Sequence, residues 1–166
     1  MSTNPFEPPE SDSRRSPREP EPAAPRSLFA AVMQGLLVDV GGSIAVGIVT
    51  MHLYALQLRA EGVPEDQLRG AMRALPHDSA LYMSTLLLGI ALSVLGGYVC
   101  ARVARRGEYR AGLVMAATST LVGLLLGQAE SDPGMAALLV VTGFACNLLG
   151  VKFGADHNRR AEAASP

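Results

Sequence analysis

Four long apolar segments, separated by short polar ones, make up most of the chain after residue 27. They cover residues 28–58, 80–103, 111–128 and 135–153. Each is predominantly apolar and has the length of roughly 17 residues or more that a helix needs to cross a hydrocarbon core of about 30 Å. None shows the ten-residue alternation of a barrel strand. The pattern therefore predicts an all-α fold, an integral membrane four-helix bundle over residues 28–154.

The two ends of the chain are polar. Residues 1–27 hold seven of the eleven prolines among Glu, Asp, Ser and Arg, with Phe6 as the one large apolar side chain after Met1. Such a segment cannot bury enough apolar surface to offset its ordering entropy, so we expect a disordered tail. Its length also argues against a secretory signal peptide. Residues 155–166 form a second polar tail.

The first polar loop contains a helix signal of its own. Pro64 is followed by two acidic residues, a combination typical of a helix start. Leu68, Met72 and Leu75 then recur at helical spacing before Pro76. We expect a short amphipathic helix that lies on the membrane surface or against the bundle.

Basic residues are distributed unequally between the loops. Eleven of the fourteen Lys and Arg residues precede the first apolar segment, follow the second or follow the fourth. The other three lie in the first loop, and the loop after the third segment has none. Because Lys and Arg concentrate on the cytoplasmic side, we expect both termini in the cytoplasm and the short amphipathic helix outside it.

Four arginines lie in the turn between the second and third segments: Arg102, Arg105, Arg106 and Arg110. Two interpretations remain open for this arginine cluster. It is a topology signal alone, or it also binds anionic lipid head groups at about 1 kcal/mol per charge.

Small residues recur at four-residue spacing within two of the apolar segments. The candidate helix-packing positions are Gly89, Ser93 and Gly97 in the second segment and Gly123 and Gly127 in the third. Small side chains let helix backbones approach closely inside a membrane. We expect these rows to face neighbouring helices.

Asp39 is the one acidic residue inside an apolar segment, where a charge costs about 2.5–3.5 kcal/mol on insertion scales. At about 1.5 Å per residue, Ser93, Thr120 and Thr142 lie at a similar depth of about 15 Å, and Asn147 about half as deep. We expect these five to form an intramembrane polar site. It is either a proton or cation site or a structural contact in which a protonated Asp39 donates to a hydroxyl or carbonyl.

Motifs for other chemistry are missing from the sequence. Gly41-Gly42-Ser43 is followed by Ala45 where a serine hydrolase elbow needs glycine, and an aspartyl mechanism needs two buried carboxylates. His52 and His77 have no neighbouring ligands that would complete a metal or haem site, and both cysteines sit in apolar runs. We therefore expect no enzyme, no cofactor and no metal. Without a basic stripe interleaved with aromatics, we expect no nucleic acid partner.

Two short stretches carry a resemblance. Residues 39–43 read Asp-Val-Gly-Gly-Ser, and residues 96–104 read Gly-Gly-Tyr-Val-Cys-Ala-Arg-Val-Ala. With these, residues 28–127 resemble a group of small bacterial four-helix integral membrane proteins of unknown role. The resemblance implies the bacterial cytoplasmic (inner) membrane and a multi-pass topology, and it implies no activity.

Two functions fit these expectations. The first is a structural or interaction role, as a subunit or scaffold of a membrane complex, with the lipid bilayer, other membrane subunits or further copies of the chain as partners. The alternative is a small transporter or channel-like subunit that uses the buried carboxylate. Because four helices are few for a complete transporter and none is interrupted by proline, the sequence favours the first.

Overall fold

The computed structural model describes residues 27–72, 76, 78–126 and 133–164, so the expected disordered segment 1–27 lies outside it except for Ser27. Every regular element in these ranges is helical, which confirms the all-α prediction. The elements are α1 (Leu28–Leu36), the π-helix η1 (Leu37–Gly41), α2 (Gly42–Ala60), α3 (Glu65–Met72), α4 (Ala80–Ala104), α5 (Glu108–Leu126) and α6 (Pro133–Ala163).

Serine hydroxyls fix the first residues of two helices. The Ser27 side chain accepts a hydrogen bond of 3.2 Å from the Ala30 amide at the start of α1. The Ser79 side chain accepts one of 3.1 Å from the Tyr82 amide at the start of α4. Each bond satisfies an amide that has no partner within its own helix.

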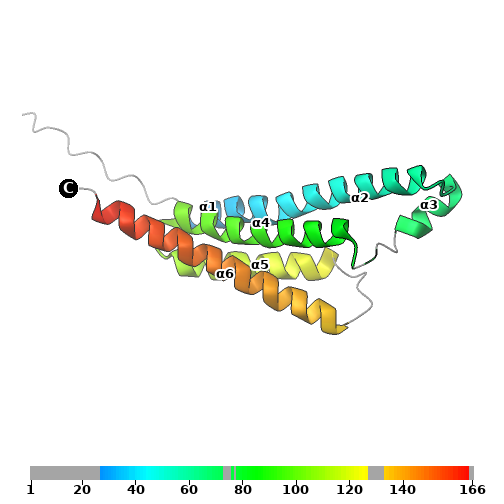
Figure 1. The fold of residues 1–166 in the computed structure, drawn as a ribbon. Helices are drawn as coiled ribbons and strands as arrows, with labels where there is room; N and C mark the ends of the chain where they lie inside the picture. The colour runs from blue at the N-terminus through cyan, green and yellow to red at the C-terminus, as the bar shows by residue number, and fades with distance from the viewer. Residues whose placement is uncertain (1–26, 73–75, 77, 127–132, 165–166) are drawn as a thin grey trace, which may run out of the picture.

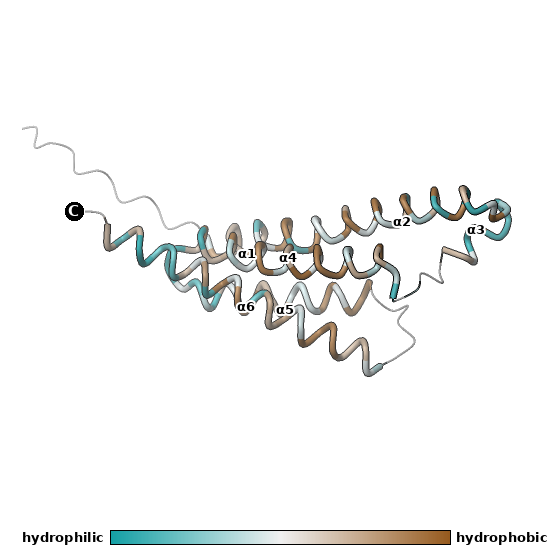
Figure 2. The backbone as a smooth tube through the Cα atoms, viewed as in Figure 1, coloured by the Kyte–Doolittle hydropathy of each residue, from teal (hydrophilic) through white to brown (hydrophobic). Residues whose placement is uncertain are grey.

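Four continuous helical stretches within the described residues are long and apolar enough to cross a membrane. The first combines α1, η1 and α2 over Leu28–Ala60. Large apolar side chains point outward, including Leu37 at 73%, Leu87 at 63% and Val141 at 65% exposure. Hydrophobic residues predominate along the middle of the long helices, and hydrophilic ones gather around α3 and at the end of α6 (Figure 2). The protein is therefore a multi-pass membrane protein.

Helix α4 is the centre of the bundle (Figure 1). It contacts α1, η1, α2, α5 and α6, most extensively α6. Helix α2 contacts neither α5 nor α6, and a hydrogen bond of 2.7 Å between the Thr50 and Thr85 hydroxyls ties it to α4. The start of α1, the α4–α5 turn and the end of α6 lie at the same end of the bundle (Figure 1).

Close packing of α4 on α6 depends on glycine. A Cβ atom added to Gly97 would overlap the Asn147 carbonyl, and one added to Gly150 would overlap the Val94 carbonyl. At the predicted packing positions Gly89 and Gly123, by contrast, an added Cβ would meet nothing within 4 Å. Neither position contacts another helix within the described chain, because four-residue spacing identifies one helix face without identifying how far along it the neighbour remains close. Gly127 lies outside the described residues.

Helix α6 continues well beyond residue 153, through most of the segment 155–166 that was expected to be a polar tail. Nothing in residues 154–163 stops a helix, since Ala, Arg and Glu are good helix formers and proline is missing there. Asn158 also binds this extension to the bundle, because its Nδ2 donates to the Ala101 carbonyl at 3.0 Å and to Glu108 at 3.4 Å.

The short helix α3 packs on the end of α2. Its buried Leu68 forms an apolar cluster with Tyr54 and Leu58. The sequence left open whether this helix lies on the membrane surface or against the bundle, and in the structure it lies against the bundle.

Candidate functional site

The site begins with Asp39, which the π-helix η1 carries at the middle of the bundle. Its side chain is 3% exposed. Gly35 and Gly96 face each other where α1 and η1 cross α4. A Cβ atom added to Gly35 would lie 3.0 Å from the Gly96 carbonyl oxygen. A Cβ atom added to Gly96 would lie 2.8 Å from the Cβ atom of Asp39. This close approach brings Asp39 against α4. Single π turns inside α-helices occur frequently at functional sites.

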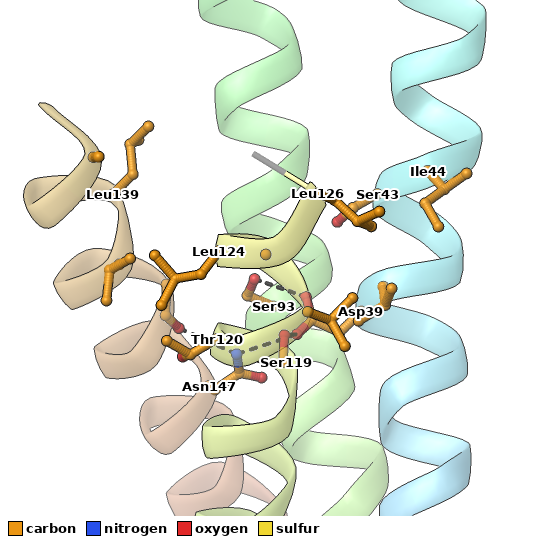
Figure 3. A pocket seen from close by; sticks show the side chains of 16 residues that line it. Asp39, Ser43, Ile44, Ser93, Ser119, Thr120, Leu124, Leu126, Leu139 and Asn147 are labelled. Carbon is orange, nitrogen blue, oxygen red and sulfur yellow. Dashed lines mark hydrogen bonds between the residues drawn. The ribbon is translucent and has the colours of Figure 1, made fainter. Parts of the chain in front are cut away.

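Three other helices each supply one hydrogen-bond donor to the Asp39 carboxylate (Figure 3). Ser93 Oγ on α4 donates to Oδ1 at 2.8 Å. Ser119 Oγ on α5 donates to Oδ2 at 2.5 Å, and Asn147 Nδ2 on α6 donates to the same oxygen at 3.2 Å. All four membrane-crossing helices therefore meet at one carboxylate, and all three donors are electrically neutral.

Asn147 has one acceptor without a partner. Its Nδ2 donates both to Asp39 and, at 3.2 Å, to the Gly143 carbonyl, so these two acceptors fix which way the amide points. Its Oδ1 is buried and accepts no hydrogen bond from the described residues. A buried acceptor left unpaired costs about 1–3 kcal/mol, which is unusual at a purely structural contact.

A partly open cavity of about 420 Å³ lies directly against this group. Its polar end consists of Asp39, Ser93, Ser119 and Asn147. Its walls are mainly aliphatic: Val40, Ile44, Val122, Leu124, Leu126, Ala136, Leu139 and Val140, with Gly123, Gly143, Ser43 and Thr120. The cavity lies where α2 diverges from α5 and α6, and Figure 3 shows Leu124, Leu126, Leu139 and Ile44 on the side of Asp39 toward the end of α5.

On the other side of Asp39 the bundle is closed. Ala31, Val32, Cys100, Ala104, Ala111 and Met115 form an apolar cluster there, and Met115, Cys100 and Ala111 are fully buried. The cavity is consequently closed on the side toward the α4–α5 turn, and the carboxylate lies at this closed end.

The structure brings together three of the five residues expected at the intramembrane polar site: Asp39, Ser93 and Asn147. Thr120 lines the cavity, whereas Thr142 does not. Sequence reasoning missed Ser119 as the direct partner because depth alone cannot separate adjacent residues that point about 100° apart on a helix. The available signal in the sequence was the spacing of four between Ser119 and the predicted packing position Gly123.

The arginine cluster lies at the closed end of the bundle, with Arg102 in the last turn of α4, Arg105 and Arg106 in the α4–α5 turn and Arg110 in the first turn of α5. All four side chains are exposed, and the ion pairs among described residues, Arg59–Glu65 and Arg159–Asp156, do not include them. The Arg102 guanidinium lies 5.9 Å from the centre of the Tyr98 ring, a cation–π contact.

The described residues offer little for metal chemistry. No group of three or more His, Cys, Asp or Glu side chains among them is placed to hold a metal ion. His52 is exposed, and His77 lies outside the described part of the chain. The arrangement is instead suited to binding a positively charged or N–H-donating group at one carboxylate.

We compared the chain with protein-family models, with curated proteins and with solved structures. None of them matches it.

Proposed function

We propose that this membrane protein binds a small cation or a proton at Asp39 and serves as a transporter or channel-like subunit. The observation that carries the proposal is a buried carboxylate, held by three neutral donors, at the closed end of an open cavity. Buried acids inside a membrane domain are costly and typically mark ion or proton pathways.

Charge balance supports this function over a structural contact. Among the described residues, those that line the cavity include no Lys, Arg or His. Hydrogen bonds from neutral donors lower the cost of the Asp39 charge without neutralising it. A cation or proton from outside the protein is then the partner that neutralises the carboxylate.

The structural or interaction role is the second candidate. It is supported by Gly47 and Gly89, where an added Cβ would meet nothing within 4 Å, so a helix of another subunit or of a second copy has room to approach. Self-association is compatible with both functions, because four helices are few for a complete transporter. We expect no catalytic role, since Asp39 is the one acidic residue among the described residues that line the cavity.

We further propose that the protein resides in a bacterial cytoplasmic membrane with both termini in the cytoplasm. The support is the distribution of basic residues, together with the arginine cluster at the end where α1 begins and α6 ends. The closed end of the cavity then faces the cytoplasmic side, and the arginine cluster faces anionic lipid head groups in the cytoplasmic leaflet.

This orientation predicts a labelling pattern. With Cys100 and Cys146 replaced by alanine, a cysteine at Met135 should react with a membrane-impermeant maleimide in intact cells. A cysteine at Arg106 should react only after the cells are opened, because it lies at the cytoplasmic end. The opposite pattern would show that the orientation is inverted.

The cation function predicts a flux. In proteoliposomes, the wild-type protein should dissipate a gradient of protons, Na⁺, K⁺ or ethylammonium, and Asp39→Asn should abolish that flux while the protein still folds. Thr142→Val is the matched control, because it removes a hydroxyl from α6 outside the cavity, and it should behave as wild type. Equal fluxes for the wild type and Asp39→Asn with every cation would contradict the proposed function.

A further inference from the structure

We infer that the cation is a primary ammonium group attached to a short aliphatic body. This inference rests on the proposed function and narrows it to one class of ligand. It follows from the size of the cavity, the hydrogen-bonding capacity of its closed end and the composition of its walls.

The cavity is too large for a bare ion alone. Its volume of about 420 Å³ falls within the range of about 300–1,000 Å³ that is typical of small-molecule pockets. Asp39 is the single acidic side chain among the described residues that line it. Most of the remaining wall is aliphatic, so an ion without an apolar body would leave that surface uncovered.

The closed end calls for N–H donors. An ionised carboxylate has about four lone-pair positions, and three donors occupy three of those on Asp39. One position is therefore left for a further donor. A primary ammonium carries three N–H donors and a positive charge, so it can supply this hydrogen bond and neutralise the carboxylate.

The walls argue against a quaternary ammonium. Proteins recognise that group chiefly through aromatic side chains, and none of the described residues that line this cavity is aromatic. A quaternary ammonium also has no N–H to donate, so the remaining lone-pair position of Asp39 would stay unpaired. Aliphatic walls instead fit an alkyl chain, and each buried methylene should tighten binding roughly fourfold.

The test is the thermal stability of the purified full-length chain in mild detergent, followed with a thiol-reactive dye that reports exposure of the buried Cys100. A ligand that binds the folded state raises the unfolding temperature. n-Hexylamine at neutral pH should raise it in a saturable manner. Trimethylhexylammonium, 1-hexanol and NaCl at equal concentration should raise it much less.

Two variants separate site binding from a general effect on the detergent. Asp39→Asn should remove the n-hexylamine effect. Gly123→Leu should remove it by filling the cavity, since Gly123 lines the cavity and has open space around it. Gly47→Leu is the matched control, because Gly47 also has open space but does not line the cavity, and it should keep the full effect.

Each remaining outcome has one meaning. Equal stabilisation by trimethylhexylammonium would overturn the requirement for N–H donors, and equal stabilisation by 1-hexanol would overturn the requirement for charge. If Na⁺ or protons stabilise the wild type but not Asp39→Asn, and n-hexylamine has no effect, the ligand class is wrong while the proposed function stands. If no cation distinguishes the wild type from Asp39→Asn, the proposed function itself fails.

Discussion

Replacing Gly97 by alanine should lower the free energy of unfolding by about 1–3 kcal/mol. The new Cβ would overlap the backbone carbonyl of Asn147, and a backbone carbonyl cannot move aside as a flexible side chain can. Helix α4 would have to move away from α6 along the most extensive contact in the bundle. Reversible unfolding in mixed detergent micelles measures the change.

Gly89→Ala is the matched control, on the same helix and eight residues earlier. An added Cβ at this position meets nothing within 4 Å, so the substitution should stabilise by about 0.5–1 kcal/mol through the helix preference of alanine. The two substitutions should thus change the free energy of unfolding in opposite directions. If Gly97→Ala were also stabilising, the close α4–α6 packing would be refuted.

Asp39→Leu should unfold more easily than Asp39→Asn by about 1–3 kcal/mol. Asparagine is nearly isosteric with aspartate and can still bond to Ser93, Ser119 and Asn147. Leucine offers these groups no acceptor, and although the two hydroxyls can turn to carbonyls of their own helices, the contacts between helices are lost. Both variants are neutral, so their difference isolates the hydrogen bonds from the cost of burying a charge.

The same unfolding measurement compares the two variants directly. A leucine variant as stable as the asparagine variant would mean that the hydrogen bonds at Asp39 add nothing to the stability of the bundle. Ser119→Ala provides an independent check: it removes the donor at 2.5 Å and should reproduce part of the loss.

The spans could be predicted from the sequence because hydrophobicity decides them locally. The extent of α6 could not, since residues 154–163 are polar enough to resemble a tail. Contacts with other helices hold this extension, chiefly the hydrogen bond from Asn158 to the Ala101 carbonyl, and such contacts do not appear in a hydropathy pattern.

Part of the candidate site could be predicted from the sequence. Asp39 stood out because a lone acid in an apolar run needs a partner, and similar depth brought Ser93 to it. Asn147 also proved to be a partner, although its expected depth was only about half that of Asp39. The role of Ser119 and the cavity depend on how the helices rotate and diverge, which spacing along one helix does not determine. The π-helix was also missed, because residues 37–41 contain no proline or other break that would signal it.

That π-helix gives the first span one residue more than a regular α-helix would need to keep α2 in place. A π turn holds one residue more than an α turn, so deleting one residue within Leu37–Gly41 other than Asp39 should restore a regular α-helix and leave α2 close to its present orientation. Thr50 should then still reach Thr85, and Leu58 should still reach Leu68. A deletion of one codon between Ser43 and Val49, in the regular part of α2, would instead rotate the following residues by about 100° and break both contacts.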